Sequence, residues 1–366
     1  MSIGISIEHI GVAADSDRGG PAQPLLTVNG LVKHFDLKKG FVDTVMGRGK
    51  VVRAVDGVDF RILKGETLGV VGESGCGKST TARLLMHLID PSAGEIVFNG
   101  ETVGSPALPL REYRRQVQMV FQDSYSSLNP RLTIQDSIAF GPQVHGVARD
   151  EAVRRARNLL ERVGLEPRRF AGRYPHELSG GQRQRVNIAR ALACEPRLVI
   201  LDEAVSALDK SVEAQVLNLL MDLKEEFGLT YLFISHDLHV VRYISDRVMV
   251  MYLGKVAETG PAEALFRQPH HPYTRALLSS MPSMDPDRRT EEAALAGDPP
   301  NPIDPPPGCR FHTRCPLAEA VCSQRVPSLE YRGQREPACL VHEPGSGHSH
   351  ATAAAAAVHT SLAEPT

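Results

Sequence analysis

Three features that would narrow the class of protein are missing from this sequence of 366 residues. No segment approaches the ~18 consecutive apolar residues that a membrane-spanning helix requires. The first residues, MSIGISIEHIGVAADSDRGG, lack the basic region and the long apolar core of a signal peptide. Charge of one sign is not in excess, because 41 Lys and Arg oppose 43 Asp and Glu for a net charge of −2. These absences predict a cytosolic chain that binds no nucleic acid and reaches a membrane only through a partner.

Closely spaced pairs of cysteines are absent too, yet four of the six cysteines cluster near the C-terminus with five, six and sixteen residues between them. In a reducing cytosol such a cluster predicts a metal or iron–sulfur site before it predicts disulfides. Structural zinc more often uses close pairs, so the wider spacing favours an iron–sulfur cluster over zinc, with no metal as the third possibility. The four candidate ligands are Cys309, Cys315, Cys322 and Cys339.

A glycine-rich stretch that is present, GESGCGKS at 72–79, matches G-x-x-x-x-G-K-[ST] between a short apolar strand (67–71) and a helix (79–89). Such a loop can wrap phosphates with its N–H groups pointing inward. Lys78 is expected to reach the β- and γ-phosphates, and the Ser79 hydroxyl to bind Mg²⁺. The alternative is a glycine-rich turn without nucleotide. The predicted ATP-binding residues are Gly72, Glu73, Ser74, Gly75, Cys76, Gly77, Lys78, Ser79 and Thr80.

Two carboxylates end a second apolar strand, RLVILDE at 197–203. At the carboxyl edge of a parallel sheet, Asp202 would lie beside the glycine-rich loop and hold Mg²⁺. Glu203 could orient or deprotonate the attacking water. An acidic pair alone is often a solvated turn, but its combination with the loop favours a catalytic role.

A second candidate phosphate-binding element, ELSGGQRQRV, occupies residues 177–186. Ser179 can cap a helix, and Gln182 completes a capping box. Gly180 and Gly181 leave the backbone bare at the first turn, where the helix dipole favours an anion. One chain therefore carries two phosphate-binding elements.

The order of elements predicts an α/β fold. Short β-type runs at 25–35, 51–62 and 94–100, with turn signals at Asn29-Gly30 and Asn99-Gly100, predict an antiparallel β-subdomain. A helical pattern covers about 130–195, and strands then alternate with helices to residue 254, which indicates a parallel-sheet core. Residues 1–24 are expected to be a flexible tail. The low-complexity residues 343–366 are expected to be disordered.

Six motifs occur in a fixed order: GESGCGKS at 72–79, Gln122 in VFQD, ELSGGQ at 177–182, LVILDE at 198–203, SALD at 206–209 and ISHD at 234–237. Together they resemble the nucleotide-binding subunit of ABC transporters over roughly residues 25–265. The resemblance implies a RecA-type P-loop NTPase core with the antiparallel β-subdomain and an inserted helical signature subdomain at about 123–195. It also implies ATP hydrolysis.

In that family two subunits sandwich two ATP molecules head to tail, so the resemblance implies that the second phosphate-binding element serves a nucleotide held by a partner. The implied contacts to that nucleotide are Ser179, Gly180, Gly181 and Gln182. Gln122 would contact Mg²⁺ and the water, and His236 the γ-phosphate. Asp209 would lie at the dimer interface. Phe35 is the candidate for stacking on adenine, with an ordinary strand residue as the alternative.

Residues 268–283, 306–322 and 336–340 resemble the C-terminal extension of oligopeptide and dipeptide importer ATPases. The resemblance implies an extension at 266–342 that carries the four cysteines, which bind a four-iron cluster in some members. It implies a second, different ATPase chain, two membrane permeases that dock near 124–134, and an external solute-binding protein. The subunit would sit at the cytoplasmic face of the cell membrane. Nickel or another small solute is an alternative cargo. A soluble ABC ATPase acting on nucleic acid or ribosomes is the other alternative; no basic stripe, second P-loop or long coiled coil supports it.

Overall fold

The computed structural model describes residues 24–37, 50–281, 300–329 and 335–351. The two predicted tails lie outside this part of the chain, except for residue 24 and residues 343–351.

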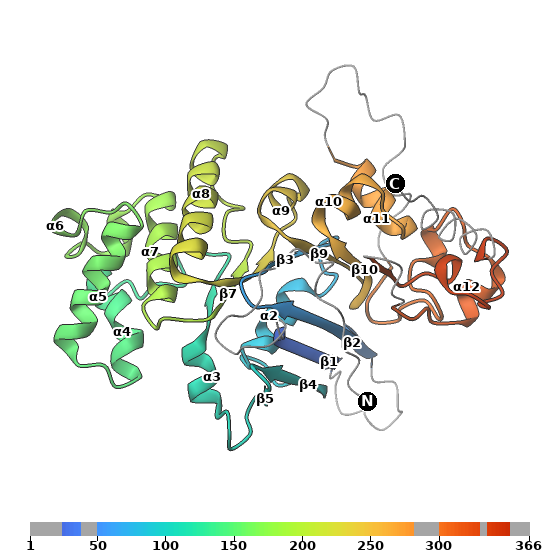
Figure 1. Ribbon diagram of the computed structural model, residues 1–366, viewed down its shortest axis with the longest axis horizontal. Coiled ribbons are helices and arrows are strands. Elements are labelled where there is room, and N and C mark those ends of the chain that lie inside the picture. The colour runs from blue at the N-terminus through green and yellow to red at the C-terminus, as the bar shows by residue number, and fades with distance from the viewer. Residues whose placement is uncertain (1–23, 38–49, 282–299, 330–334, 352–366) are drawn as a thin grey trace, which may run out of the picture.

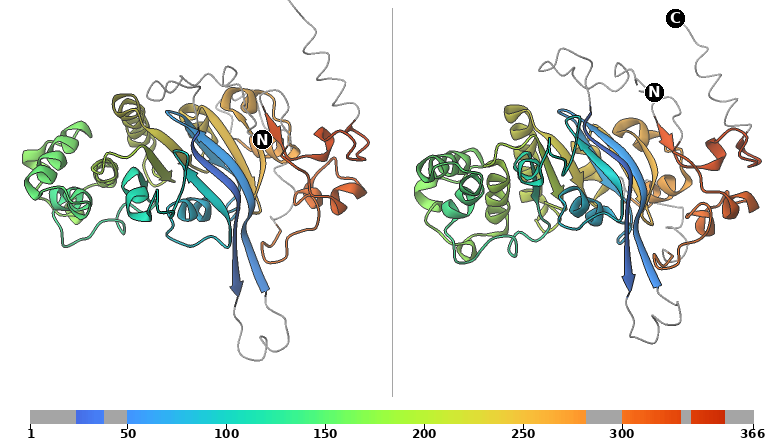
Figure 2. Two further views of the ribbon diagram at one scale, coloured as in Figure 1. Left: turned by 60° about the horizontal axis from the view of Figure 1, so that its bottom comes forward. Right: turned by 90° about the horizontal axis from the view of Figure 1, so that it is seen from below.

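A four-stranded antiparallel sheet forms the first layer, in the order β2-β1-β4-β5. Its strands are β1 (Pro24–Leu37), β2 (Lys50–Leu63), β4 (Ala93–Phe98) and β5 (Glu101–Thr102). In this sheet Leu26 pairs with Ile62 and Phe35 with Val52. The expected antiparallel β-subdomain is confirmed, and β1 and β2 extend together as a long ribbon (Figure 2).

The second sheet has seven strands in the order β11-β10-β9-β3-β8-β7-β6. Its parallel part contains β3 (Thr67–Val71), β6 (Val117–Val120), β7 (Leu198–Asp202), β8 (Thr230–Ile234) and β9 (Arg247–Tyr252). All residues of β3, β7, β8 and β9 are buried, as expected for parallel strands covered on both faces. The antiparallel strands β10 (Lys255–Pro261) and β11 (Glu336–Pro337) complete one edge.

Helices gather in three places along the molecule (Figure 1). Next to the sheets lie α2 (Lys78–Leu85), α3 (Leu110–Gln116), α8 (Lys210–Phe227) and α9 (Leu238–Ile244). At one end are α4 (Ile134–Val144), α5 (Arg149–Arg162), α6 (Pro167–Phe170), the short 3₁₀ turn η2 (Pro175–Glu177) and α7 (Gly180–Leu192). Towards the other end lie α10 (Ala262–Arg267), α11 (Pro272–Ser279), η3 (His312–Arg314), α12 (Ala320–Gln324) and η4 (Leu340–His342).

Two local predictions need correction. The helix expected at 79–89 ends at Leu85, because His87 adopts a φ of 49° and the Leu88 N–H bonds to the Arg83 carbonyl at 2.9 Å, a Schellman-type ending. Asn29-Gly30 is an irregularity inside β1 rather than a turn, since pairing with β2 resumes at Leu31 after a register shift. Asn99-Gly100 does form the turn between β4 and β5.

Residues 343–351, expected to be disordered, pack against the C-terminal region. His348 is 4% exposed, and its Nε2 lies 2.8 Å from the carbonyl oxygen of Leu317. Ser346 is also buried, and its hydroxyl donates to the Leu340 carbonyl at 2.7 Å. Across the described ranges, no helix combines the length and apolarity that a membrane span needs.

Candidate functional site

The glycine-rich loop lies between β3 and α2, at the carboxyl end of a central parallel strand, where α/β sheets bind ligands. Gly77 is the N-cap residue of α2, with a φ of 108°. A Cβ atom there would lie 2.4 Å from the Ala54 carbonyl oxygen, so only glycine fits. The loop therefore leads into the N-terminus of α2, where backbone N–H groups favour phosphate.

Lys78 crosses this loop. Its Nζ donates to the carbonyl oxygens of Gly72 at 2.7 Å and Glu73 at 3.1 Å, and the residue is 6% exposed. Cys76 lies beside it, with Sγ 3.8 Å from Nζ. Burial raises the pKa of the Cys76 thiol, which keeps it protonated and weakly nucleophilic.

Ser79 and Asp202 meet next to the lysine. The Ser79 hydroxyl donates to Asp202 Oδ1 at 2.9 Å, and Asp202 is 4% exposed at the end of β7. Burial raises the pKa of the Asp202 carboxyl, and the bond from Ser79 opposes that rise. A hydroxyl and a carboxylate are oxygen donors of the kind that Mg²⁺ prefers, so the donor set fits a magnesium ion held together with phosphate oxygens.

Three further predicted residues converge from the ends of neighbouring strands. Gln122 follows β6, Glu203 follows β7 and His236 follows β8. Gln122 Nε2 donates to Glu203 Oε2 at 2.8 Å, and His236 Nδ1 lies 3.4 Å from the same oxygen. Glu203 adopts a left-handed φ of 49°, and its N–H bonds to the Ile234 carbonyl at 2.9 Å. The turn thus fixes the carboxylate between the amide and the imidazole.

These groups open into one cavity of about 420 Å³. Three of its lining residues were not predicted: Val52 and Ala54 from β2, and Pro302 from the C-terminal region. Alternation along β2 could have suggested the first two, whereas nothing in the local sequence marks Pro302. The predicted residues that line the cavity are Ser74, Gly75, Gly77, Lys78, Ser79, Thr80, Gln122, Glu203 and His236.

The signature segment begins α7 elsewhere in the chain. The predicted capping box is confirmed: Ser179 Oγ accepts from the Gln182 N–H at 3.3 Å, and Gln182 Oε1 accepts from the Ser179 N–H at 3.0 Å. A Cβ atom on Gly181 would lie 2.5 Å from Val212 Cγ1, so glycine lets α7 approach α8. Ser179 is exposed, and none of residues 179–182 lines the loop cavity.

Asp209 and Phe35 also lie outside the cavity lining. Asp209 is the exposed N-cap residue of α8, and its Oδ1 accepts from the Val212 N–H at 3.0 Å; this bond lowers the pKa of the carboxyl. Phe35 is half exposed in β1, and its strand partner Val52 does line the cavity. Phe35 therefore adjoins a lining residue of the cavity, and its contact with adenine stays a prediction.

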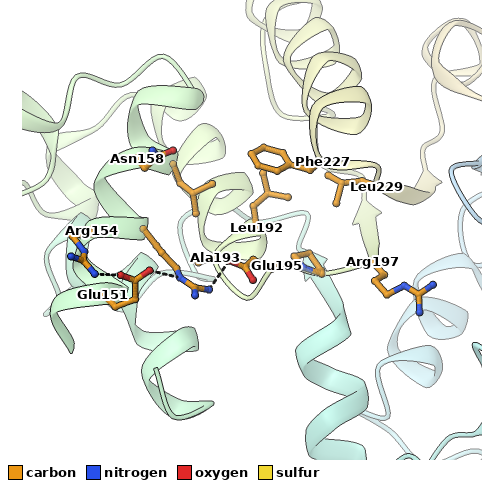
Figure 3. Close-up of a pocket in the computed structure, with 12 residues that line it drawn as sticks. Glu151, Arg154, Asn158, Leu192, Ala193, Glu195, Arg197, Phe227 and Leu229 are labelled. Atoms are coloured by element: carbon orange, nitrogen blue, oxygen red, sulfur yellow. Dashed lines mark hydrogen bonds and ion pairs between the residues drawn. The ribbon is translucent and has the colours of Figure 1, made fainter. Parts of the chain in front are cut away.

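A second cavity, of about 480 Å³, lies between α5, α7 and α8 (Figure 3). It is at the amino ends of β7 and β8, marked by Arg197 and Leu229, whereas the loop cavity follows their carboxyl ends. Arg155 bridges Glu151 at 3.2 Å and Glu195 at 2.7 Å across its rim. No predicted site residue lines it, and Glu151, Arg154, Arg155 and Glu195 are already paired with one another.

The four clustered cysteines surround a much smaller cavity, of about 10 Å³, roughly the space that one water molecule requires. Burial raises the pKa of Cys309 to about 11 and that of Cys339 to about 12, so both side chains are neutral thiols when no metal is bound. Within the described residues, no three or more His, Cys, Asp or Glu side chains are placed to hold a metal ion. The prediction of an iron–sulfur cluster or zinc at Cys309, Cys315, Cys322 and Cys339 is therefore not supported.

The parallel sheet with a glycine-rich loop at its carboxyl edge, and the lysine, serine and acidic pair around it, define a P-loop nucleotide-binding protein. Comparison with known families agrees. Residues 55–206 match the model of the ABC transporter family, and residues 257–322 match that of the oligopeptide/dipeptide transporter C-terminal region.

Relatives match over most of their length. A "probable peptide ABC transporter ATP-binding protein" of Sinorhizobium fredii is 52% identical over 88% of this chain and 91% of its own. The oligopeptide transport ATP-binding protein AppF of Bacillus subtilis is 49% identical over 84% of this chain and 94% of its own. The chain therefore belongs to the ATP-binding proteins of the oligopeptide/dipeptide branch of the ABC transporter family.

Solved structures agree on the fold. A component of an ABC transporter complex from Clostridium perfringens superimposes with a TM-score of 0.57 at 29% identity, over 67% of this chain and 91% of the other. A dimeric ATP-binding cassette in a post-hydrolysis state, bound to ADP and Pi, gives a TM-score of 0.55 at 29% identity, over 65% of this chain and 98% of the other.

Proposed function

We propose that this chain binds and hydrolyses ATP and thereby energises an ABC importer for peptides. One observation carries the proposal: Lys78, Gln122, Glu203 and His236 all line the same cavity. A phosphate-binding lysine, a carboxylate and two polar groups are what phosphoryl transfer to water needs. The peptide cargo follows from the names of the relatives and from the C-terminal match.

In this mechanism Lys78 exchanges its loop carbonyl partners for phosphate oxygens of ATP. Ser79 and Asp202 would hold Mg²⁺, and the bound ion would supply positive charge beside the phosphate oxygens. Glu203 accepts a proton from the attacking water. Gln122 and His236 keep the Glu203 carboxylate oriented, and His236 reaches the γ-phosphate.

The catalytic site is completed by a second subunit. Ser179, Gly180, Gly181 and Gln182 form the first turn of α7, away from this chain's own loop cavity, and Gly180 and Gly181 leave the backbone of that turn without side chains. We assign them to the nucleotide of the partner ATPase, a different chain, with Asp209 at the interface between the two. The helices α4 to α7 then make up the signature subdomain at about 123–195, within a nucleotide-binding domain at 25–265. Phe35 reaches adenine beside Val52.

ATP hydrolysis by the ATPase pair drives conformational change in two permeases, and an external binding protein delivers the peptide to them. Residues 124–134 follow Gln122 directly and present Tyr125, which is 54% exposed, as a permease contact. Residues 266–342 form the C-terminal extension. The subunit acts at the cytoplasmic face of the inner membrane through these permeases. The proposal assigns no metal to the four cysteines.

The test is isolation of the tagged full chain from membranes of its own cells. Two integral membrane proteins and a second ATPase chain should accompany it, and peptides should stimulate ATP hydrolysis when the complex is in vesicles with the binding protein. A Lys78→Ala chain should assemble equally but neither bind ATP nor support uptake. Recovery with nucleic acid at moderate salt, and without membrane proteins, would contradict the proposal.

The shared site has its own test. Ser179→Ala should leave ATP binding by the isolated chain intact and impair hydrolysis by the pair. The substitution also removes a helix cap, which costs about 1 kcal/mol. Thr133→Ala, compared in the isolated chain and in the ATPase pair without permeases, is the matched control for loss of a helix cap, because Thr133 caps α4 by accepting from the Asp136 N–H at 3.2 Å and does not line the loop cavity. Loss of binding by the isolated Ser179 variant would count against a shared site.

A further inference from the structure

The C-terminal region reaches back to the nucleotide-binding loop. Pro302 lines the loop cavity, and its carbonyl accepts from the Arg53 N–H on β2 at 3.1 Å. Twelve positions further on, Arg314 bonds to Glu73 inside the loop motif. We propose that Arg314 is a positioning residue that holds the loop in its nucleotide-binding conformation through Glu73. This inference rests on the proposed ATPase function.

The contact between Arg314 and Glu73 is a two-pronged, shielded ion pair. Nη1 lies 2.9 Å from Glu73 Oε2, and Nη2 lies 3.1 Å from Oε1. The Arg314 side chain is 6% exposed and that of Glu73 is 20% exposed. A fork-to-fork geometry fixes the orientation of a carboxylate as well as its position. The bond to Glu73 raises the pKa of the Arg314 guanidinium further. Arg314 is therefore permanently charged and held in one orientation.

Glu73 passes this constraint to the loop through its backbone. Its carbonyl accepts from Lys78 Nζ at 3.1 Å and from the Cys76 N–H at 3.2 Å, and its N–H donates to the Tyr273 hydroxyl at 2.9 Å. Side chain, N–H and carbonyl of one residue are thus all engaged. Movement of the Glu73 side chain would displace the carbonyl that bonds to the phosphate-binding lysine.

The support behind Arg314 is rigid. Its Nη1 lies 3.3 Å from the Tyr252 hydroxyl. The rings of Tyr252, Tyr273 and Phe311 pack on one another with centroid distances of 4.5, 5.4 and 5.3 Å. Burial raises the pKa of the Tyr252 hydroxyl, which therefore stays neutral. Three aromatic side chains from β9, α11 and the C-terminal region thus fix the arginine's surroundings.

A neighbouring arginine ties the same segment to the other side of the loop. Arg310 is 7% exposed and bonds both to the Asp56 carboxylate and to the Leu253 carbonyl. Gly254, which follows Leu253, donates its N–H to the Cys76 carbonyl at 2.8 Å, and its carbonyl accepts from the Asp56 N–H at 2.9 Å. The C-terminal segment therefore braces the loop at Glu73 directly and at Cys76 through the β9–β10 turn.

Loss of Arg314 has a specific consequence. Without Arg314, we expect the Glu73 carboxylate to swing towards Lys78, which would displace the Glu73 carbonyl from the lysine and let the carboxylate compete with ATP phosphates for its positive charge. Arg314→Gln should therefore raise the KM for ATP about tenfold, as expected when a charge-assisted contact is lost, while kcat changes little. Removing the competing charge as well, in Arg314→Gln with Glu73→Gln, should restore most of the affinity. A purely structural role predicts no such recovery.

The experiment measures MgATP binding by the full chain, KM and kcat of the assembled complex, and the melting temperature of each variant. Arg314→Lys keeps the positive charge but cannot form the two-pronged contact, so its KM for ATP should lie between those of wild type and Arg314→Gln. It replaces the glutamine variant in the test if that variant does not fold. Arg325→Gln is the matched control, because Arg325 pairs with Glu343 at 2.8 Å, is 45% exposed and lies away from the loop.

The inference is overturned if Arg314→Gln leaves the KM for ATP unchanged, or if the double variant binds ATP no better than the single one. Lys78→Ala separates this result from failure of the proposed function. If Lys78→Ala abolishes ATP binding while Arg314→Gln leaves it intact, only the positioning role is wrong. If Lys78→Ala itself binds ATP normally, the proposed function is wrong.

Discussion

Replacing Glu203 with glutamine tests the proposed catalytic step most directly. The two side chains have the same shape, and a glutamine oxygen can still accept from Gln122 Nε2, which lies 2.8 Å from Glu203 Oε2. Only the ability to accept a proton is lost. General base catalysis contributes about 10²–10⁴-fold, so kcat should fall by that factor, or about 3–5 kcal/mol in activation free energy. ATP binding should be nearly unchanged.

The assay follows phosphate release by the assembled complex and, separately, the fluorescence of a labelled ATP analogue bound to the chain. The variant should also retain ATP in a closed pair of subunits, because the nucleotide is not consumed. Glu226→Gln is the matched control, since Glu226 is a surface carboxylate paired with Arg162 on α5. Turnover of Glu203→Gln close to that of wild type would refute the assignment of Glu203 as the base.

Three further outcomes follow from the structure. Gly181→Ala should destabilise the chain by about 1–3 kcal/mol through overpacking, because the new Cβ atom would lie 2.5 Å from Val212 Cγ1. Gly180→Ala should be tolerated, because the nearest atom to its Cβ would be 4.0 Å away. Urea unfolding of the two variants measures the difference. Acidification should weaken the fold. Burial lowers the pKa of His271 to about 3, so this side chain gains a proton only in the unfolded chain, where its pKa is near 6.5, and its contribution to the free energy of unfolding should drop by about 1.4 kcal/mol at about pH 5.5. His271→Asn, which retains an acceptor for the Tyr273 N–H, should lose less stability over that range.

Much of the fold could be predicted from the sequence where signals are local. The mainly apolar runs 67–71 and 198–202 coincide with fully buried strands, because a strand covered on both faces is built mostly of apolar residues. The capping box at 179–182 was also predictable, because its hydrogen bonds join residues only three positions apart in the sequence. The order of the motifs along the chain also predicted that Gln122 and Glu203 belong to the same site.

Long-range contacts could not be predicted in this way. The pair between Glu73 and Arg314 joins residues 241 positions apart, and neither end carries a local signal. Pro302 resembles any other proline in a proline-rich stretch. The helix predicted to reach residue 89 ends at Leu85, because His87 adopts a left-handed conformation that stops it. Each of these features depends on a tertiary contact or a backbone conformation, which the spacing of residues in the sequence does not reveal.

The pairing of β11 with β10 has a consequence for how the chain can be divided. Glu258 and Thr259 on β10 lie opposite Pro337 and Glu336, so the last strand shields the border of the central sheet. Glu258 is fully buried there, and its carboxylate accepts from the N–H groups of His270 and His271 at 2.9 Å each. Truncation after β10 would expose the edge of β10 with its unpaired N–H and C=O groups, which favours aggregation. It would also remove the hydrogen-bond partners of the Glu258 carboxylate. The C-terminal region is thus built into the ATPase core and is not a detachable appendage.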